Sequence, residues 1–304
     1  MKAIIVKDLV KKYSDLTAVN GISFEVEKGS VFAFLGTNGS GKSTTIGCIT
    51  TTNKINDGNI TVNGHKVGTD DDAIRREIGV VFQTSLLDDL LTVRENIASR
   101  AAFYNLGIDV DARISELSKT LDLDSFLDQR YGTLSGGQKR RADIARALVH
   151  KPNILFLDEP TAGLDPASRE NVWQTIYDLQ KKSGLTVFLT THYMEETERA
   201  DMVYVINNGD YVASGTPQSL RTEFSRDKLK LVGIRQKELI ISLNKDKIGY
   251  IIKNDAIIIN VASSKVAMNL LKKYESAIKD FEFVHGNMDD VFLELTKQGE
   301  EAYL

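Results

Sequence analysis

The 304-residue sequence contains a single cysteine, Cys48. One thiol excludes an internal disulfide framework and a cysteine-rich metal site, and it fits the reducing conditions of the cytosol. Long apolar runs are also missing: the strongly apolar stretches, such as 256–262, have the length of a strand, whereas a membrane-spanning helix needs roughly 20 apolar residues. The first 13 residues hold too short an apolar run for a signal peptide. We therefore expect a chain that does not cross a bilayer by itself and that reaches a membrane only through a partner.

An excess of positive charge is missing as well. The sequence has 38 Lys and Arg against 42 Asp and Glu, a formal net charge of -4. This balance gives no overall attraction to nucleic acid or anionic lipid, so no nucleic-acid partner is expected. The basic run 139–141 is interpreted as the solvated face of a helix, which could contact a partner or phosphate. Neither an internal repeat nor a low-complexity segment interrupts the sequence.

The order of β-rich and helical patterns predicts an α/β fold with a mostly parallel sheet. Strands are expected within 29–36, 153–160 and 184–192, a helix from Lys42, and a hairpin around Asn208-Gly209. Helical patterns dominate between about 85 and 150, which predicts a helical subdomain inserted into a domain spanning 1–220. A small α+β domain is expected at 221–304, with strands at 238–243 and 250–261 and a helix that Ser263 or Ser264 caps.

The segment 36–44, GTNGSGKST, matches the pattern G-x-x-x-x-G-K-[ST] between a predicted strand and a predicted helix. Its glycines allow successive N–H groups to point at phosphate oxygens, and the helix dipole adds partial positive charge at the same place. Lys42 supplies a full charge for the β- and γ-phosphates, and the Ser43 hydroxyl suits Mg²⁺. The segment therefore predicts a P-loop, whose candidate nucleotide-binding residues are Gly36, Asn38, Gly39, Ser40, Gly41, Lys42, Ser43 and Thr44.

Two acidic residues, Asp158 and Glu159, end the apolar run ILFLDEP. An unpaired carboxylate at the end of a buried strand is costly, and Mg²⁺ is the natural compensation for Asp158. Glu159 can accept a proton from an attacking water molecule. A P-loop enzyme needs both a metal-holding acid and a group that activates water, so the pair predicts phosphoryl transfer to water.

With the segment LSGGQ at 134–138, the sequence resembles the ATP-binding subunits of ABC transporters. This segment is similar to the signature that separates the family from other P-loop ATPases, and the similarity covers residues 1 to about 217. The run from LSGGQ to GLDP and the terminal MDDVFLELT at 288–296 further resemble drug-resistance exporters, whose permease is a separate chain. The resemblance implies ATP and Mg²⁺ as ligands. It also implies a head-to-tail dimer in which each ATP lies between one subunit's P-loop and the other's signature.

The resemblance assigns four further site residues. Tyr13 looks like the aromatic residue that stacks on adenine, and Gln83 looks like the glutamine that joins the ATPase core to the helical subdomain and contributes to catalysis and metal binding. His192 looks like the switch histidine that senses the γ-phosphate, and Asp165 lies in GLDP, which looks like the D-loop. Simpler interpretations stay open: packing for Tyr13, an ordinary polar strand end for Gln83, and a structural histidine at 192.

On the opposite face of the nucleotide, the resemblance assigns the signature residues Ser135, Gly136, Gly137 and Gln138. The residues themselves agree with this assignment. Ser135 is a candidate cap of a helix that runs to about 150, so the N–H groups and the dipole of that helix would face an anion. Glycines at the next two positions allow the main chain to come close to it.

We therefore hypothesise an ATP-hydrolysing subunit of an ABC exporter, present as a homodimer or paired with a related ATPase. It would lie on the cytoplasmic face of the cell membrane through a separate integral-membrane permease. Leu86, Leu87, Leu90 and Leu91 could form the docking surface for that permease or the core of the helical subdomain. Two alternatives stay open: a soluble ABC ATPase that acts on ribosomes or nucleic acid, and a nucleotide-dependent regulator without transport. The single ATPase unit, the lack of a heptad run and the net acidic charge weigh against the first alternative.

Overall fold

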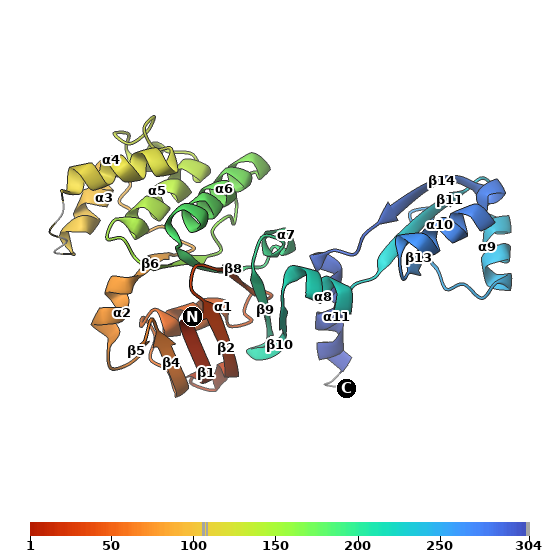
Figure 1. The fold of residues 1–304 in the computed structure, drawn as a ribbon, viewed down its shortest axis with the longest axis horizontal. Coiled ribbons are helices and arrows are strands. Elements are labelled where there is room, and N and C mark those ends of the chain that lie inside the picture. Colours follow the sequence, from red (N-terminus) through yellow and green to blue (C-terminus); the bar gives the residue numbers. More distant parts are fainter. Residues whose placement is uncertain (105–106, 108, 302–304) are drawn as a thin grey trace. The chain divides into compact units, whose positions relative to one another are not determined.

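The computed structural model describes residues 1–104, 107 and 109–301, with side chains as far as residue 296. The chain divides into two compact units, Met1–Thr216 and Pro217–Leu304 (Figure 1). The division precedes helix α8 (Pro217–Phe224) because this helix packs on α11 (Met288–Glu301) within the second unit. Residues 302–304 of the predicted second domain lie outside the described residues.

The first unit is built on a six-stranded sheet in the order β10-β9-β3-β8-β7-β6. Its strands are β3 (Val31–Leu35), β6 (Ile78–Val81), β7 (Ile154–Asp158), β8 (Thr186–Thr191), β9 (Met202–Asn207) and β10 (Asp210–Gly215). All neighbours run parallel except β10, which forms a hairpin with β9. Every residue of β3, β7 and β8 is buried, as is usual for strands covered on both faces. The predicted parallel sheet and the predicted hairpin are confirmed.

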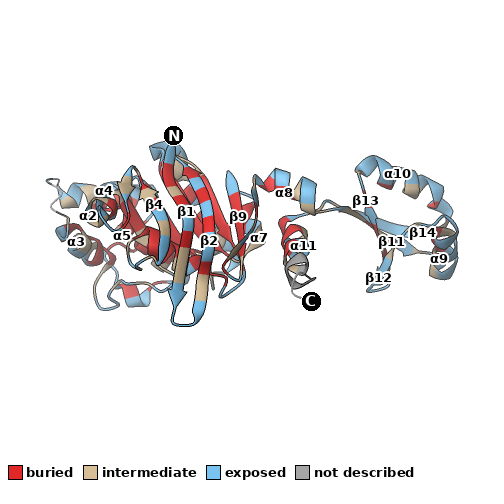
Figure 2. Cartoon of the chain, turned by 90° about the horizontal axis from the view of Figure 1, so that it is seen from below, coloured by how far each residue is buried: buried red, intermediate tan, exposed pale blue. Residues whose placement is uncertain are grey.

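A second, antiparallel sheet of four strands completes this unit, in the order β2-β1-β4-β5. Its strands are β1 (Lys2–Tyr13), β2 (Leu16–Glu27), β4 (Asp57–Val62) and β5 (His65–Lys66). The sequence does not predict it, because irregularities in the β1–β2 register interrupt the alternation of buried and exposed residues. Aromatic rings join the two sheets: Phe24 packs against Phe32 at 5.4 Å and against Tyr204 at 5.0 Å between centroids. Figure 2 shows buried residues along strands of both sheets. These residues form one hydrophobic cluster, which holds the β1–β2 hairpin against the central sheet.

Helices occupy the remainder of the first unit. They are α1 (Lys42–Ile49), α2 (Asp71–Glu77), α3 (Val93–Ala102), α4 (Val110–Leu121), the 3-10 turn η1 (Tyr131–Thr133), α5 (Gly136–Leu148), α6 (Pro166–Ser183) and α7 (Met194–Thr197). Helices α3, α4 and α5 pack together, and α5 also packs on β6 and α6. Between 85 and 150 the described residues form no strand, in agreement with the predicted helical subdomain. No helix in the described part of the chain has the length and apolar character needed to span a bilayer.

The second unit contains a four-stranded antiparallel sheet in the order β12-β13-β11-β14. Its elements are β11 (Asp227–Gly233), α9 (Gln236–Lys245), β12 (Ile251–Lys253), β13 (Ala256–Val261), α10 (Ser264–Lys273), the turn η2 (Glu275–Ala277) and β14 (Ile278–Val284). This β-α-β-β-α-β order is that of a ferredoxin-like fold. The strand predicted at 238–243 is wrong: the segment lies in α9, where Leu239 and Leu243 are buried one turn apart. The cap of α10 is Ser263, which accepts a hydrogen bond from the Val266 N–H.

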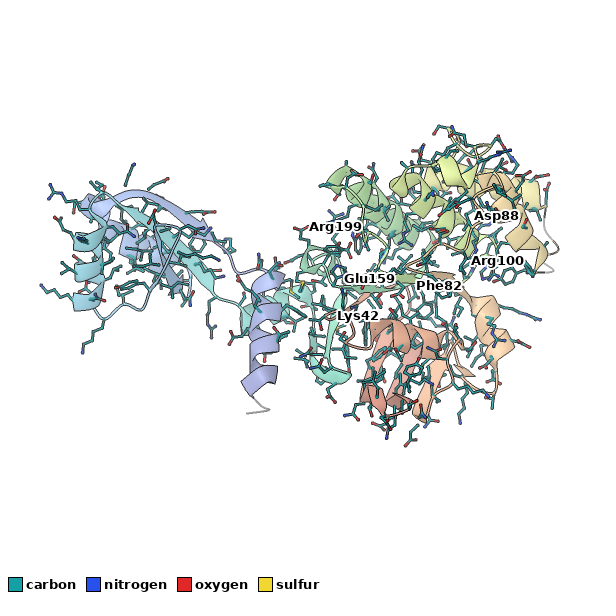
Figure 3. All side chains as sticks on the ribbon, turned by 180° about the vertical axis from the view of Figure 1, so that it is seen from behind. Lys42, Phe82, Asp88, Arg100, Glu159 and Arg199 are labelled. Atoms are coloured by element: carbon teal, nitrogen blue, oxygen red, sulfur yellow. The ribbon has the colours of Figure 1, made fainter. Side chains whose placement is uncertain are left out.

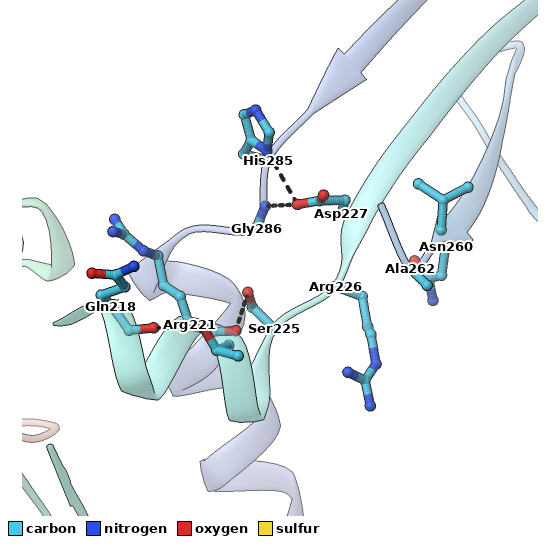
Figure 4. A pocket seen from close by; sticks show the side chains of 11 residues that line it. Gln218, Arg221, Ser225, Arg226, Asp227, Asn260, Ala262, His285 and Gly286 are labelled. Atoms are coloured by element: carbon cyan, nitrogen blue, oxygen red, sulfur yellow. Dashed lines mark hydrogen bonds and ion pairs between the residues drawn. The ribbon is translucent and has the colours of Figure 1, made fainter. Parts of the chain in front are cut away.

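A hollow of about 850 Å³ lies in this second unit, beside the start of β11 (Figure 4). Asp227 Oδ1 accepts a hydrogen bond from the Gly286 N–H at 3.1 Å and lies 3.3 Å from His285 Nδ1. The side chains of Arg221, Arg226 and His285 point in different directions rather than toward one centre (Figure 4). This hollow therefore lacks the convergent polar groups that are typical of a ligand site.

Candidate active site

The glycine-rich segment 36–44 joins the carboxyl end of β3 to the start of α1. Gly41 caps α1 with a φ of 102°, and a Cβ atom there would lie 2.4 Å from the Ala18 carbonyl oxygen. A Cβ atom on Gly36 would lie 2.4 Å from Ser40 Oγ. Neither position has room for a side chain, so the main chain itself forms the surface at the amino end of α1. Such a surface suits an anion, because free N–H groups and the helix dipole both point toward it.

Lys42 is almost fully buried in this segment, with only 4% of its surface exposed. Its Nζ atom donates hydrogen bonds to the carbonyl oxygens of Gly36 at 3.0 Å and Thr37 at 2.9 Å, and it lies 3.6 Å from Glu159 Oε1. Burial lowers the pKa of Lys42, and the neighbouring Glu159 carboxylate opposes this shift. A buried ammonium group gains from a further anionic partner, which a phosphate would supply.

Asp158 and Ser43 lie together although they are far apart in the sequence. Asp158 Oδ1 accepts a hydrogen bond from Ser43 Oγ at 3.2 Å and another from Thr190 Oγ1 at 2.5 Å. No group of three His, Cys, Asp or Glu side chains that could hold a metal exists among the residues the structure describes. Mg²⁺ commonly binds through one or two protein oxygens together with substrate phosphates. The hydroxyl and carboxylate oxygens at this point of the sheet fit a magnesium ion bound in that way.

Three predicted site residues converge on the carboxylate of Glu159, which is 8% exposed. Gln83 Nε2 donates to Glu159 Oε2 at 3.1 Å, and Lys42 Nζ lies 3.6 Å from Oε1. Lys42 and Glu159 are labelled in Figure 3. His192 Nδ1 lies 3.3 Å from Oε1, within ion-pair distance, yet the geometry gives this buried atom no hydrogen-bond partner among the described residues. Such an unsatisfied polar atom beside the P-loop is a suitable donor or acceptor for a bound phosphate.

The main chain at Glu159 has a left-handed conformation with a φ of 47°. This conformation costs a residue other than glycine about 1–2 kcal/mol. Strain of this kind persists only when the surrounding structure holds it, and it often occurs at functional sites. The direction in which the Glu159 side chain leaves the main chain therefore depends on contacts that hold this conformation, which the sequence does not reveal.

A cavity of about 700 Å³ extends from the P-loop. Tyr13 lies at its edge, at the end of β1, with 44% of its surface exposed and Lys11 Nζ 4.6 Å from its ring centroid. An exposed ring beside a phosphate-binding turn is able to stack on a base. The cavity is lined by Tyr13, Leu16, Thr17, Ala18, Asn38, Gly39, Gly41, Lys42, Ser43, Thr44, Gln83, Glu159 and Asn208.

Four of these lining residues are not predicted by the sequence: Leu16, Thr17, Ala18 and Asn208. The first three follow Tyr13 in the chain, but their position depends on the pairing of β1 with β2. Asn208 lies in the β9–β10 hairpin, whose turn is close to the P-loop because the Gly209 N–H donates to the Ser40 carbonyl at 3.1 Å. No sequence signal connects that hairpin to the nucleotide.

The signature segment lies elsewhere in the chain. Ser135 caps α5 as predicted: its Oγ accepts from the Gln138 N–H, and Gln138 Oε1 accepts from the Ser135 N–H at 2.9 Å. A Cβ atom on Gly137 would lie 2.9 Å from Ser168 Oγ, so this glycine permits close packing on α6. Neither Ser135, Gly136, Gly137 nor Gln138 lines the P-loop cavity. Within one chain, the structure does not bring the two predicted halves of the nucleotide site together.

Asp165 likewise does not line the P-loop cavity. It is the N-cap of α6, where its Oδ1 accepts from the Ser168 N–H at 3.0 Å. This contact with Ser168 lowers the pKa of Asp165. Asp165, which the resemblance assigns to the D-loop, therefore has a structural contact in this chain.

The interpretation of 139–141 as a solvated face is wrong for Arg140, which is only 7% exposed. Its guanidinium group donates to the Phe82 carbonyl at 2.8 Å, whereas Arg141 bonds to Asp122. The sequence does carry a signal for this burial. Arg140 shares a helical stripe with the buried residues Gly137, Ile144 and Ala147, at spacings of three and four.

Comparison with known proteins agrees with this geometry. The sequence model of the ABC transporter family matches residues 19–162. The daunorubicin/doxorubicin resistance ATP-binding protein DrrA of Streptomyces peucetius is 34% identical over 97% of this chain and 92% of its own length. The linearmycin resistance ATP-binding protein LnrL of Bacillus subtilis (strain 168) is 38% identical over 77% of this chain and 76% of its own length.

A solved structure has the same fold as the first unit of this chain. An ATP-binding cassette in a dimeric post-hydrolysis state, bound to ADP and Pi, matches 70% of this chain and 98% of its own length. Its TM-score is 0.64 at 29% identity. A P-loop with its lysine, an acid pair and a capped signature helix thus occur here on the fold of that cassette. The chain belongs to the ABC transporter family, among its ATP-binding, ATP-hydrolysing subunits.

Proposed function

We propose that this chain powers export through a separate integral-membrane permease by closing head to tail on two ATP molecules with a second copy or a related ATPase. The observation that carries this proposal is the separation of the P-loop cavity from Ser135 within one chain. Ser135 is exposed and caps a helix whose first N–H groups can receive an anion from a second subunit. A two-fold axis would give each of two sites both halves.

Export, rather than another task, is supported by the relatives. DrrA and LnrL are named as resistance proteins, and a further relative in Burkholderia lata, 34% identical over 95% of this chain, is named as a Nod factor export protein. These names favour the exporter hypothesis over a nucleic-acid-acting ATPase or a regulator. They do not identify the compound that would be transported, because the contacts with that compound would belong to the permease.

In the proposed reaction, Glu159 accepts the proton of the water that attacks the γ-phosphate. In the present conformation Lys42 lies against Glu159, and the negative charge of a bound phosphate would draw Lys42 away and leave the carboxylate free to act. Lys42 and His192 then stabilise the charge that develops on the γ-phosphate oxygens. Tyr13 would stack on the adenine at the edge of the cavity.

Ser43, Asp158 and Gln83 are the residues proposed to hold Mg²⁺. The ion, when bound, would neutralise charge on the β- and γ-phosphates. Gln83 lies at the start of the segment that leads into the helical subdomain, and its side chain reaches Glu159. A movement of the helical subdomain would therefore move Gln83 relative to Glu159, and ATP binding at Glu159 would act on the subdomain through the same contact.

A docking surface for the permease is proposed on the helical subdomain. Leu86 and Leu90 are 61% and 75% exposed, and Phe103, at the end of α3, is 81% exposed. Leu86 and Leu90 are therefore too exposed to belong to the core of the helical subdomain. Large apolar side chains that are exposed together mark interaction sites. A permease held there would place the chain on the cytoplasmic face of the membrane.

Mixed dimers test the shared site. Lys42→Ala removes the P-loop charge, and Ser135→Asp keeps a good N-cap for α5 while placing a carboxylate against the opposite phosphates. Each variant alone is expected to be inactive. A mixed dimer contains one site with both defects and one intact site, so a 1:1 mixture should recover roughly a quarter of the wild-type ATPase rate. If no mixing ratio gives ATPase activity although both variants fold and dimerise, each nucleotide site belongs to one chain and the proposal is refuted.

A further inference from the structure

Arg140 has an unusual environment for an arginine on a helix near the surface. Its side chain is 7% exposed, and burial lowers its pKa. Among the residues that the structure describes, no ion pair joins a carboxylate to Arg140; Asp143 and Asp158 act on its charge without a direct contact. A buried guanidinium group is costly unless its N–H groups are satisfied, so its hydrogen-bond partners show what this residue does.

Its partners are three main-chain carbonyl groups. Nη1 donates to the Phe82 carbonyl at 2.8 Å, and Nη2 lies 3.4 Å from the Gln83 carbonyl and 3.3 Å from the Glu159 carbonyl. Phe82 and Gln83 follow β6, and Glu159 follows β7. One side chain on α5 therefore joins the two loops that carry the proposed Gln83 and Glu159 functions.

The contact with Glu159 falls where the main chain is strained. On the amino side of its left-handed Cα, the Glu159 N–H donates to the Thr190 carbonyl at 3.2 Å and to Thr190 Oγ1 at 3.1 Å. On the carboxyl side, the Glu159 carbonyl accepts from Arg140. Both peptide groups beside Glu159 are thus held, and together they fix the direction in which its side chain leaves the main chain.

We propose that Arg140 is a positioning residue for ATP hydrolysis, which orients the Glu159 carboxylate and couples it to the signature helix. Arg140 and Ser135 lie at the same end of α5, about a turn and a half apart. Movement of Ser135 toward or away from the second subunit's ATP therefore moves the group that holds Glu159 in its own site. This inference rests on the proposed role of Glu159 as the general base.

The variant Arg140→Gln tests the proposal, because glutamine is too short to reach both loops. We expect kcat to fall at least tenfold while KM for ATP and the Kd for a fluorescent ATP analogue stay within twofold. Arg140→Lys should recover part of kcat, because an ammonium group can still donate to the carbonyls. Arg141→Gln is the matched control: Arg141 follows directly on α5 but bonds to Asp122 and to the Leu121 carbonyl, so its kcat should stay within twofold.

A double variant separates positioning from a general structural role. If Arg140 acts through Glu159, then Arg140→Gln should cause no further loss of single-turnover hydrolysis when Glu159→Gln is already present. A multiplicative loss in the double variant, or a kcat for Arg140→Gln equal to that of Arg141→Gln, would overturn the proposal. If Arg140→Gln and Arg140→Lys both show a higher KM for ATP and a lower thermal unfolding temperature, the role of Arg140 is structural and the proposal is also overturned. Wild-type turnover by Glu159→Gln alone would instead refute the base assignment, which keeps the two failures distinguishable.

Discussion

The exchange Glu159→Gln changes one atom in the group on which Lys42, Gln83 and His192 converge. The amide can still accept a hydrogen bond from Gln83, but it cannot take a proton from water. Because general base catalysis contributes about 10²–10⁴-fold, we expect kcat to fall by that factor, or about 3–5 kcal/mol in the activation barrier. The fold should be retained, since the side-chain volume and the Gln83 contact are kept.

The same exchange should not weaken ATP binding. Lys42 Nζ and Glu159 Oε1 are 3.6 Å apart, so their attraction is about 5 kcal/mol at an effective dielectric constant of about 20, before the cost of burial is subtracted. ATP has to compete with this pair for Lys42. Removing the carboxylate charge removes that competition, and the Kd for ATP is expected to stay equal or to decrease.

Phosphate release measures turnover, a fluorescent ATP analogue measures affinity, and light scattering with ATP measures dimer formation. Glu170→Gln is the control for an isosteric change outside the site, because Glu170 pairs with Arg199 on the surface of the first unit. A kcat for Glu159→Gln within threefold of that control would refute the assignment of the base. A large loss of ATP affinity would refute the argument that Glu159 competes for Lys42.

Two further predictions concern the P-loop and the pH dependence of stability. Gly41→Ala should lower the affinity for ATP more than tenfold, because the Cβ atom meets the Ala18 carbonyl at 2.4 Å. Gly64→Ala shares the left-handed strain without any clash and should cost only about 1–2 kcal/mol of stability in urea unfolding. For His150, burial lowers the pKa to about 4, below its unfolded value of 6.5, so its contribution to stability is lost as the pH falls through 6.5 toward 4. Between pH 7 and 5 the wild-type protein should lose about 2 kcal/mol of unfolding free energy that His150→Gln does not lose, and an equal loss in both proteins would contradict the assignment.

Local patterns were sufficient where the chemistry is itself local. The P-loop follows from glycines that alone fit at positions 36 and 41, and the cap of α5 follows from Ser135 three residues before Gln138. The β9–β10 hairpin follows from Asn208-Gly209. In each case the residues that determine the structure are neighbours in the chain.

Patterns failed where burial depends on distant partners. The segment 238–243 contains apolar residues that suit a strand, and it forms α9 because Leu239 and Leu243 pack on the small sheet. Arg140 lies within a basic run, which suggests exposure to solvent. It is buried because carbonyl groups from two other loops accept hydrogen bonds from its guanidinium group. The antiparallel sheet that carries Tyr13 depends on strand pairing across more than 40 residues, with Lys7 opposite Asn59.

The sequence by itself determined the fold class, the phosphate-binding turn and the identity of the acids that follow β7, because glycine conformation and strand periodicity are short-range properties. Only the tertiary structure decided that Lys42, Gln83 and His192 meet at Glu159, and that Arg140 holds the main chain there. The physical reason is that parallel strands end at one edge of the sheet. Because β3 pairs with β8 and β8 pairs with β7, Lys42, which follows β3, lies beside Glu159, which follows β7.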